Sequence, residues 1–309
     1  MKQFLKWLTL FMLLPVAVFV ITMYRADGRT DAFYLRFTTP PQSSLILGTS
    51  RAAQGIQPHV LDSVLNANGR AVTSFNYSFA IGYSNYGAAY YGSVRKKLDP
   101  AAQNGVFILA VDPWSIASDN GSVRAGKPEH EWTFLRTLNF VNMDPNVEYL
   151  MEEYDKPILN ILVPDPRKVD DRLLLHRDGW LETNLDLSPA AVAERTTKKV
   201  KEYRDTRLNS STPSPWRLGY LEMTVDLLQK HGTVILVRLP VHSSMMALED
   251  QLMPSFDRTM ELLAQRKKVN YLSFPANDRE WSFTDGNHLI PRDGAKVTQR
   301  IAEEILAIQ

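Results

Sequence analysis

Short apolar runs alternate with longer amphipathic segments from residue 44 to the end of the chain. The apolar runs are Ser44–Leu47, Ala71–Phe75, Val106–Val111, Val234–Leu239 and Val269–Phe274. A short apolar run bounded by turn residues is typical of a buried parallel strand. The segments with helical spacing are Val60–Leu65, Asn85–Lys97, Tyr220–Lys230, Leu252–Gln265 and Arg292–Ile308. This alternation predicts an α/β fold, a doubly wound parallel sheet with helices on both faces.

The alternation fails between residues 115 and 215, after the third predicted strand. This stretch is rich in prolines, aromatic residues and charged residues, and it contains no internal repeat. We expect a long insertion over the sheet, mostly helical and looped, and not a separate domain.

The N-terminal segment has the pattern of a membrane helix. Lys2 and Lys6 precede the run Trp7–Tyr24, which is apolar apart from two threonines. That length approaches the minimum for a membrane-spanning helix, with an aromatic residue at each end. We therefore predict an uncleaved anchor over 1–24, a spacer over 25–42 and a domain over 43–309 that lies outside the cytoplasm.

Two other interpretations of this segment remain open. A cleaved secretory signal is one, although no small-x-small cleavage site follows the apolar run. A buried helix in a soluble cytosolic protein is the other, and it would require residues 7–24 to be covered by the rest of the chain.

The amino-acid composition excludes several classes of binding partner and of reactive site. The chain has 309 residues, a formal net charge of +1 and scattered basic residues, which argues against nucleic acid as a partner. It contains 0 cysteines, so disulfides, cysteine-ligated metals and thiol nucleophiles are excluded. Phosphate-cradling loops, dinucleotide fingerprints and metal-ligand histidine spacings are absent from the sequence. We predict no metal, no nucleotide and no other cofactor.

Two short polar motifs lie at the ends of predicted elements. Gly48-Thr49-Ser50 follows the first strand, and reaction sites in open α/β sheets lie just beyond the carboxyl ends of strands. Asp285 and His288 precede the last helix, and a carboxylate beside an imidazole fixes its tautomer. We expect Ser50 Oγ to lie within hydrogen-bond reach of His288, giving a nucleophile, a base and an orienting acid. The alternative is a histidine that only bonds within its turn.

In this order, the two motifs resemble those of the SGNH (GDSL-type) hydrolase family. The family's Gly-Asp-Ser block corresponds to Gly48-Thr49-Ser50, with threonine in place of aspartate, and its Asp-x-x-His block corresponds to Asp285–His288. The resemblance spans residues 43–309, but only the two ends match closely. It implies an SGNH-hydrolase-like fold and a triad of Ser50, His288 and Asp285.

The resemblance also implies an oxyanion hole, which stabilises the charge of a tetrahedral intermediate. Its donors would be the Ser50 N–H and Gly82, with the backbone at Ser78 as an alternative to Gly82. The family has an asparagine after the third strand, whereas this chain has Asp112-Pro113-Trp114. An ionised aspartate cannot donate a hydrogen bond, and Asn85 is a possible substitute.

Two further residues are candidates for substrate binding. Arg51 follows the candidate nucleophile, and we expect it to bind an anionic or hydroxylated substrate. The alternative is a solvated arginine in the first helical turn. Trp114 would stack on a sugar ring, or else would pack in the interior. The segment His176–Trp180 would form a substrate wall, or else a surface turn.

The chain resembles in particular the membrane-anchored SGNH-like proteins of bacterial cell-surface polysaccharide systems. That resemblance implies a serine esterase or O-acyltransferase acting on acyl, above all acetyl, esters of an envelope or extracellular polysaccharide. The alternative is a non-catalytic SGNH-like protein that binds glycan or polysaccharide-assembly proteins.

Overall fold

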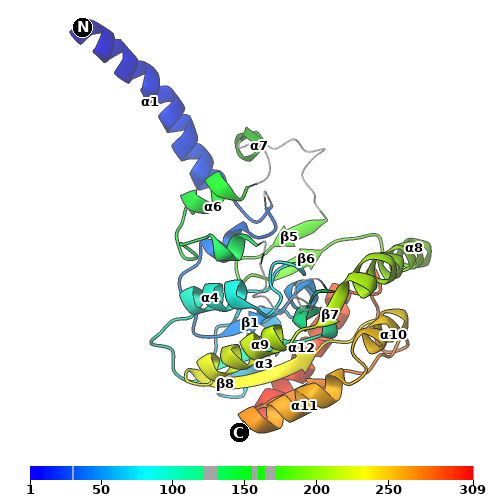
Figure 1. The fold of residues 1–309 in the computed structure, drawn as a ribbon. Coiled ribbons are helices and arrows are strands. Elements are labelled where there is room, and N and C mark those ends of the chain that lie inside the picture. Colours follow the sequence, from blue (N-terminus) through cyan, green and yellow to red (C-terminus); the bar gives the residue numbers. More distant parts are fainter. Residues whose placement is uncertain (30, 121–130, 132, 155–158, 164–171, 309) are drawn as a thin grey trace.

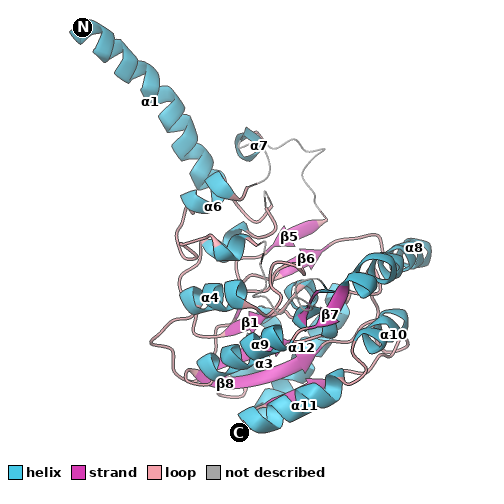
Figure 2. Cartoon of the chain, in the orientation of Figure 1, coloured by secondary structure: helices cyan, strands magenta, loops and turns pink. Residues whose placement is uncertain are grey.

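A five-stranded parallel sheet forms the centre of the protein (Figures 1 and 2). The computed structural model describes residues 1–29, 31–120, 131, 133–154, 159–163 and 172–308. The sheet has the order β2-β1-β3-β8-β9. Its strands are β1 (Leu45–Leu47), β2 (Phe75–Asn76), β3 (Gly105–Ala110), β8 (Gly232–Arg238) and β9 (Asn270–Ser273).

The order of the strands places a switch point beside β1. The chain runs from β1 to β2 on one side and then returns to β3 on the other side of β1. Ligands of open α/β sheets bind outside the carboxyl ends of the strands at such a reversal. Ser50 comes three residues after the end of β1 at Leu47, so it lies at this position.

Helices cover both faces of the sheet. One face packs against α4 (Ala88–Lys97), α9 (Pro215–Leu228) and α11 (Phe256–Lys267). The other packs against α2 (Ser50–Gly55), α3 (Pro58–Ala67) and α12 (Pro291–Ala307). Alternate residues of β3 belong to the two cores, because successive side chains of a strand point to opposite faces. The predicted α/β fold with a parallel sheet is confirmed.

Two predicted element boundaries were wrong. The second strand was expected over Ala71–Phe75, but the Ser74 N–H donates to Asp62 of α3 and only Phe75–Asn76 joins the sheet. A helix was expected over Leu252–Gln265, but that helix, α11, starts only at Phe256, and the preceding α10 (Ser243–Leu252) was not predicted. Pro254 lies in the break, and proline disfavours helical backbone in the residue before it.

The insertion between β3 and α9 contains small sheets that the sequence did not predict. β4 (Ala117–Asp119) pairs antiparallel with β7 (Ser211–Pro213), and β5 (Leu173–Leu175) pairs antiparallel with β6 (Leu181–Thr183). Parts of the predicted insertion, 121–130, 132, 155–158 and 164–171, lie outside the described residues. Its helical elements are the 3₁₀ segments η2 (Pro113–Ile116) and η3 (Phe134–Arg136), the helices α6 (Val147–Glu152), α7 (Leu159–Leu162) and α8 (Pro189–Glu202), and the π-helical segment η4 (Tyr203–Leu208).

The N-terminal helix α1 (Lys2–Arg25) projects away from the body (Figure 1). Its most apolar window has a mean hydropathy of 2.3, is not buried anywhere, and is long enough to cross a membrane. A secretory signal shares these properties, so the helix is consistent with either. Its last turns touch the described part of the body through buried Thr22 and Met23 and partly buried Phe19.

The segment predicted as a spacer, 25–42, contributes to the core. It contains the 3₁₀ helix η1 (Tyr34–Phe37), and Tyr34 and Phe37 are fully buried. Arg36 is also buried and donates to the carbonyls of Asn76 and Gly179. This stretch is therefore packed against the domain over much of its length.

Candidate active site

Ser50 lies at the start of α2, directly after a tight turn out of β1. Gly48 has φ of +147°, and a Cβ there would come within 2.8 Å of the Ala110 side chain and 2.9 Å of the Ala52 side chain. Glycine is required by this close approach of β1, β3 and α2. The carbonyl of Thr49 accepts the Ala52 and Ala53 N–H groups, which sets Ser50 as the first helical residue.

A compact loop carries Asp285 and His288 into α12. The Thr284 N–H donates to the His288 carbonyl at 2.8 Å, which closes the loop. Asp285 Oδ1 accepts the N–H groups of Asn287 and His288, each at 3.0 Å. Gly286 has φ of +76°, and a Cβ there would meet Thr196 of α8 at 2.8 Å. Glycine therefore allows α8 to pack directly over the loop.

The structure brings Ser50, His288 and Asp285 together. His288 Nε2 lies 2.8 Å from Ser50 Oγ, the contact that was expected from the sequence. His288 Nδ1 lies 3.0 Å from both carboxylate oxygens of Asp285. An ionised carboxylate can only accept, so Nδ1 carries a proton and Nε2 is free to accept the Ser50 hydroxyl proton.

The electrostatics around Asp285 keep its carboxylate charged. Burial alone would raise the pKa of Asp285, but His288 and the N–H of Asn287 lower the pKa well below its usual value. The His288 side chain is only 10% exposed, so the two groups interact with little solvent between them. A permanently ionised Asp285 stabilises the imidazolium that forms when His288 takes a proton.

The predicted oxyanion donors are only partly in place. The Ser50 N–H is in the first turn of α2, where amides have no partner within the helix. The Gly82 N–H, in contrast, donates to Asn85 Oδ1 at 2.8 Å. This N–H was predicted to donate to the oxyanion, but here it already has another acceptor. The N–H of Ser78 donates to Asn76 Oδ1, and Asn85 Nδ2 donates to the Trp114 carbonyl.

Arg51 is a buried structural residue and not the substrate contact that was predicted. Its Nη1 lies 2.5 Å from Glu249 Oε1 and 3.8 Å from Asp112 Oδ2. Its Nε and Nη2 both donate to Asn287 Oδ1, at 3.0 and 2.7 Å. Burial would lower the pKa of Arg51, but the carboxylates of Glu249 and Asp112 outweigh burial and raise it. The Arg51 side chain points into the interior because the carboxylates of Glu249 and Asp112 balance its charge there.

Trp114 is likewise an interior residue. It is 2% exposed and packs edge-on against Tyr203, with ring centroids 5.1 Å apart. A sugar cannot stack on it in this arrangement. His176 and Trp180 stack on each other at 4.8 Å, and the Trp180 indole donates to the Gln54 carbonyl of α2. The His176–Trp180 hairpin thus braces the helix that begins with Ser50.

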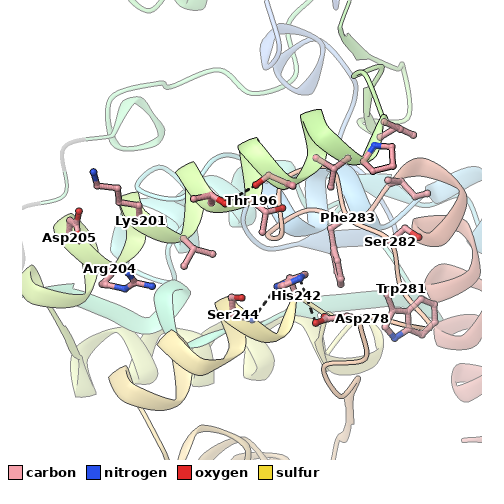
Figure 3. A pocket seen from close by; sticks show the side chains of 17 residues that line it. Thr196, Lys201, Arg204, Asp205, His242, Ser244, Asp278, Trp281, Ser282 and Phe283 are labelled. Carbon is pink, nitrogen blue, oxygen red and sulfur yellow. Dashed lines mark hydrogen bonds and ion pairs between the residues drawn. The ribbon is translucent and has the colours of Figure 1, made fainter.

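A pocket of about 970 Å³ adjoins the Asp285–His288 loop (Figure 3). It lies between α8 and the start of α10, and Phe283 points into it. The lining residues do not include Ser50, Asp285 or His288. The pocket shares its walls with the loop, because Thr196 faces Gly286 and the His242 N–H donates to the Gly286 carbonyl at 3.0 Å. Among the described residues, no cluster of three or more metal-ligating side chains occurs.

Two buried residues of this region were not identified from the sequence. Asn287 lies inside the Asp-x-x-His motif, and its amide Nδ2 is 3.3 Å from His288 Nε2. Glu249 is completely buried and pairs with both Arg51 and Arg238. Asn287 was identifiable as a polar residue between two candidate catalytic residues, whereas no local pattern distinguishes Glu249 from a solvated glutamate.

Comparison with known proteins identified no relative: no family model, no curated protein and no solved structure matches this chain.

Proposed function

We propose that this protein is a serine esterase or O-acyltransferase that works through Ser50, His288 and Asp285. The observation that carries the proposal is the 2.8 Å contact between Ser50 Oγ and His288 Nε2, with Asp285 on the other ring nitrogen. A hydroxyl bonded to a base that a third group orients is the arrangement of an activated nucleophile. Its position at the switch point of a parallel sheet supports the same proposal.

The reaction begins with attack by Ser50 Oγ on the carbonyl carbon of an ester. His288 Nε2 takes the hydroxyl proton, and the Asp285 carboxylate stabilises the resulting imidazolium. When the carbon–oxygen bond of the alcohol breaks, His288 returns the proton to the departing alkoxide. The acyl-enzyme is then attacked by water in hydrolysis, or by a sugar hydroxyl in transfer.

The substrate class rests on the resemblance to SGNH hydrolases of polysaccharide systems. We propose acyl esters, above all acetyl esters, of an envelope or extracellular polysaccharide. The α8–α10 pocket supports a site for the carbohydrate, because ligand pockets combine apolar walls with a few polar groups that fix orientation. Phe283 and Val192 supply apolar surface there, and Thr196 and Ser244 supply hydroxyls.

The location follows from the N-terminal helix. We propose that α1 anchors the chain in a membrane and that the body lies outside the cytoplasm, beside the polysaccharide. The exposed apolar surface of α1 supports this, since a lipid phase would remove that surface from water. Polysaccharide-assembly proteins are the proposed partners.

The second candidate is a non-catalytic SGNH-like protein that binds glycan or assembly proteins. It is favoured by two observations. The end of β3 carries Asp112, a buried carboxylate, where the family has a donor asparagine. The Gly82 N–H is also occupied by Asn85. In this second candidate function, the protein would bind a polysaccharide without hydrolysing or transferring its ester groups.

Labelling with a fluorophosphonate probe separates the two candidates. An activated serine is modified by the probe, so we expect labelling and turnover of 4-nitrophenyl acetate by the full chain in detergent. Ser50→Ala should abolish both, while Ser188→Ala, which removes an exposed serine, should leave both intact. Folded protein with no Ser50-dependent labelling and no turnover would instead support the binding protein.

A further inference from the structure

An acyl transfer at Ser50 requires donors for the oxygen that becomes negative. The loss of one such donor typically costs about 2.7–4 kcal/mol of transition-state stabilisation. The Ser50 N–H is one donor, but Gly82 donates to Asn85, and the position after β3 where the family has an asparagine carries the carboxylate of Asp112. A side-chain donor on another element would fill this role.

The amide of Asn287 is oriented by its contacts. Arg51 donates two hydrogen bonds to its Oδ1, at 3.0 and 2.7 Å. A guanidinium group can only donate, so the oxygen of the amide faces Arg51 and the nitrogen faces the other way. There, Nδ2 lies 3.3 Å from His288 Nε2, the atom that also contacts Ser50 Oγ. Asn287 is 2% exposed, so water does not compete for this N–H.

Arg51 is held in turn by buried carboxylates. Glu249 of α10 lies 2.5 Å from Nη1, and Asp112 at the end of β3 lies 3.8 Å from the same nitrogen. A positive charge on the oxygen side of an amide strengthens donation by its nitrogen, because hydrogen bonds in a chain polarise one another. Arg51 is therefore a positioning residue that also polarises the Asn287 amide.

We propose that Asn287 Nδ2 is the side-chain donor of the oxyanion hole, in place of a donor at the end of the third strand. This inference rests on the proposed esterase or acyltransferase function. In the free protein the lone pair of His288 Nε2 is shared between the Ser50 hydroxyl and the Asn287 N–H. When the Ser50 oxygen–carbonyl carbon bond forms, Nε2 takes the hydroxyl proton and can no longer accept.

The Asn287 N–H is released by the same step that creates the oxyanion. The carbonyl π pair moves to the ester oxygen, and that oxygen accepts hydrogen bonds from the Asn287 side chain and the Ser50 N–H. When the intermediate collapses, the pair returns, the bond to the alcohol breaks, and His288 protonates the alkoxide. His288 Nε2 is then free to accept from Asn287 again.

Asn287→Asp and Asn287→Ala test this role. The aspartate variant removes the donor but still accepts from Arg51, so we expect it to fold, which thermal unfolding will check. Both variants should lower kcat for 4-nitrophenyl acetate by about 100- to 1,000-fold, with little change in KM, and should slow fluorophosphonate labelling of Ser50 similarly. Asn68→Asp, the same change at an exposed asparagine, should match the wild type.

The pH profile separates a donor from a structural residue. A new carboxylate beside His288 raises the pKa of the imidazole, so the acid limb of kcat/KM should move to higher pH in Asn287→Asp but not in Asn287→Ala. Loss of kcat at the plateau of both profiles supports the donor role. A folded Asn287→Asp variant that keeps kcat within about threefold would overturn it while leaving the Ser50 chemistry standing. Absence of Ser50-dependent labelling in the wild type would overturn both.

Discussion

Buried charges organise the carboxyl end of the sheet. Arg51, expected to face a substrate, instead pairs with Glu249 and Asp112 and donates to Asn287. Burying an ion is costly unless partners with good geometry surround it, and here each charge has an opposite charge nearby. One result is that α2, which begins with the candidate nucleophile, is tied to the loop that carries the candidate base.

Asp112 lies farther from Arg51 than Glu249 does, at 3.8 Å against 2.5 Å. Burial raises the pKa of Asp112, and the positive charge of Arg51 offsets only part of that rise. Its pKa is therefore higher in the folded than in the unfolded chain. Between those two values the folded state binds more protons, so this group makes the free energy of unfolding fall as pH rises.

Asp112→Asn should remove this pH dependence. The side-chain oxygen of asparagine can still accept the Ser115 N–H that Asp112 Oδ1 now accepts. We expect the variant to gain stability relative to the wild type as the pH rises above the usual aspartate pKa of about 3.9, by at most about 1.4 kcal/mol for each unit by which folding raises the pKa of Asp112. Urea unfolding at several pH values measures the difference, with Asp250→Asn at an exposed site as the control for net charge. A difference that stays constant with pH would contradict the prediction.

Helices from the insertion and from the fourth βα unit hold the Asp285–His288 loop in place. Arg195 of α8 donates to the Thr284 carbonyl at 2.8 Å, and the N–H of His242, just before α10, donates to Gly286. The pocket between these helices borders the loop from that side (Figure 3). A polymer bound there would lie next to the triad, while a small ester would not need the pocket.

Filling this pocket should therefore affect large and small substrates differently. Ala193→Trp places an indole on the pocket side of α8, at an exposed position. We expect KM for an O-acetylated polysaccharide to rise about tenfold or more, while kcat/KM for 4-nitrophenyl acetate stays within about twofold. Lys198→Trp, at an exposed position of α8 outside the pocket lining, is the matched control. Equal effects of Ala193→Trp on both substrates would argue against a glycan site here.

The molecule as a whole consists of an α/β body and a protruding apolar helix (Figure 1). The body has its own cores on both faces of the sheet. Among the described residues, α1 packs against the body near its C-terminal end, through buried Thr22 and Met23 and partly buried Phe19. Arg25 adds a hydrogen bond to the Leu162 carbonyl of α7. The body should thus fold without most of α1.

Deletion of residues 2–17 tests the anchor while keeping those contacts. The truncated chain should move from the membrane pellet to the supernatant, and it should unfold at the same temperature as the detergent-extracted full chain within a few degrees. The full chain, washed with high salt, is the control and should stay in the pellet. N-terminal sequencing of the mature protein checks the alternative. A mature chain that starts after residue 24 would contradict the prediction, because it would be a cleaved secretory protein and not an anchored one.

Local patterns were sufficient to locate the strands of the sheet, but not every boundary. Each of the five predicted strands overlaps an observed strand, because a strand buried on both faces is a continuous apolar run. The second strand was overextended because side chains of α3 bind the backbone of residues 72 and 74, and such bonds have no local signature. The antiparallel pairs of the insertion were missed for a similar reason, since their strands have only three residues each.

The sequence alone determined that a serine follows the first strand and that an aspartate and a histidine precede the last helix. Their contact was foreseeable because both elements border the same end of a parallel sheet. The direction of Arg51, the interior place of Trp114 and the orientation of the Asn287 amide were decided only by the tertiary structure. Arg51 contacts Asn287, which lies 236 positions away in the sequence, and Glu249 of α10, a helix that the pattern did not predict. Periodicity encodes which side chains are buried, whereas the partner that each buried charge finds depends on how distant elements pack.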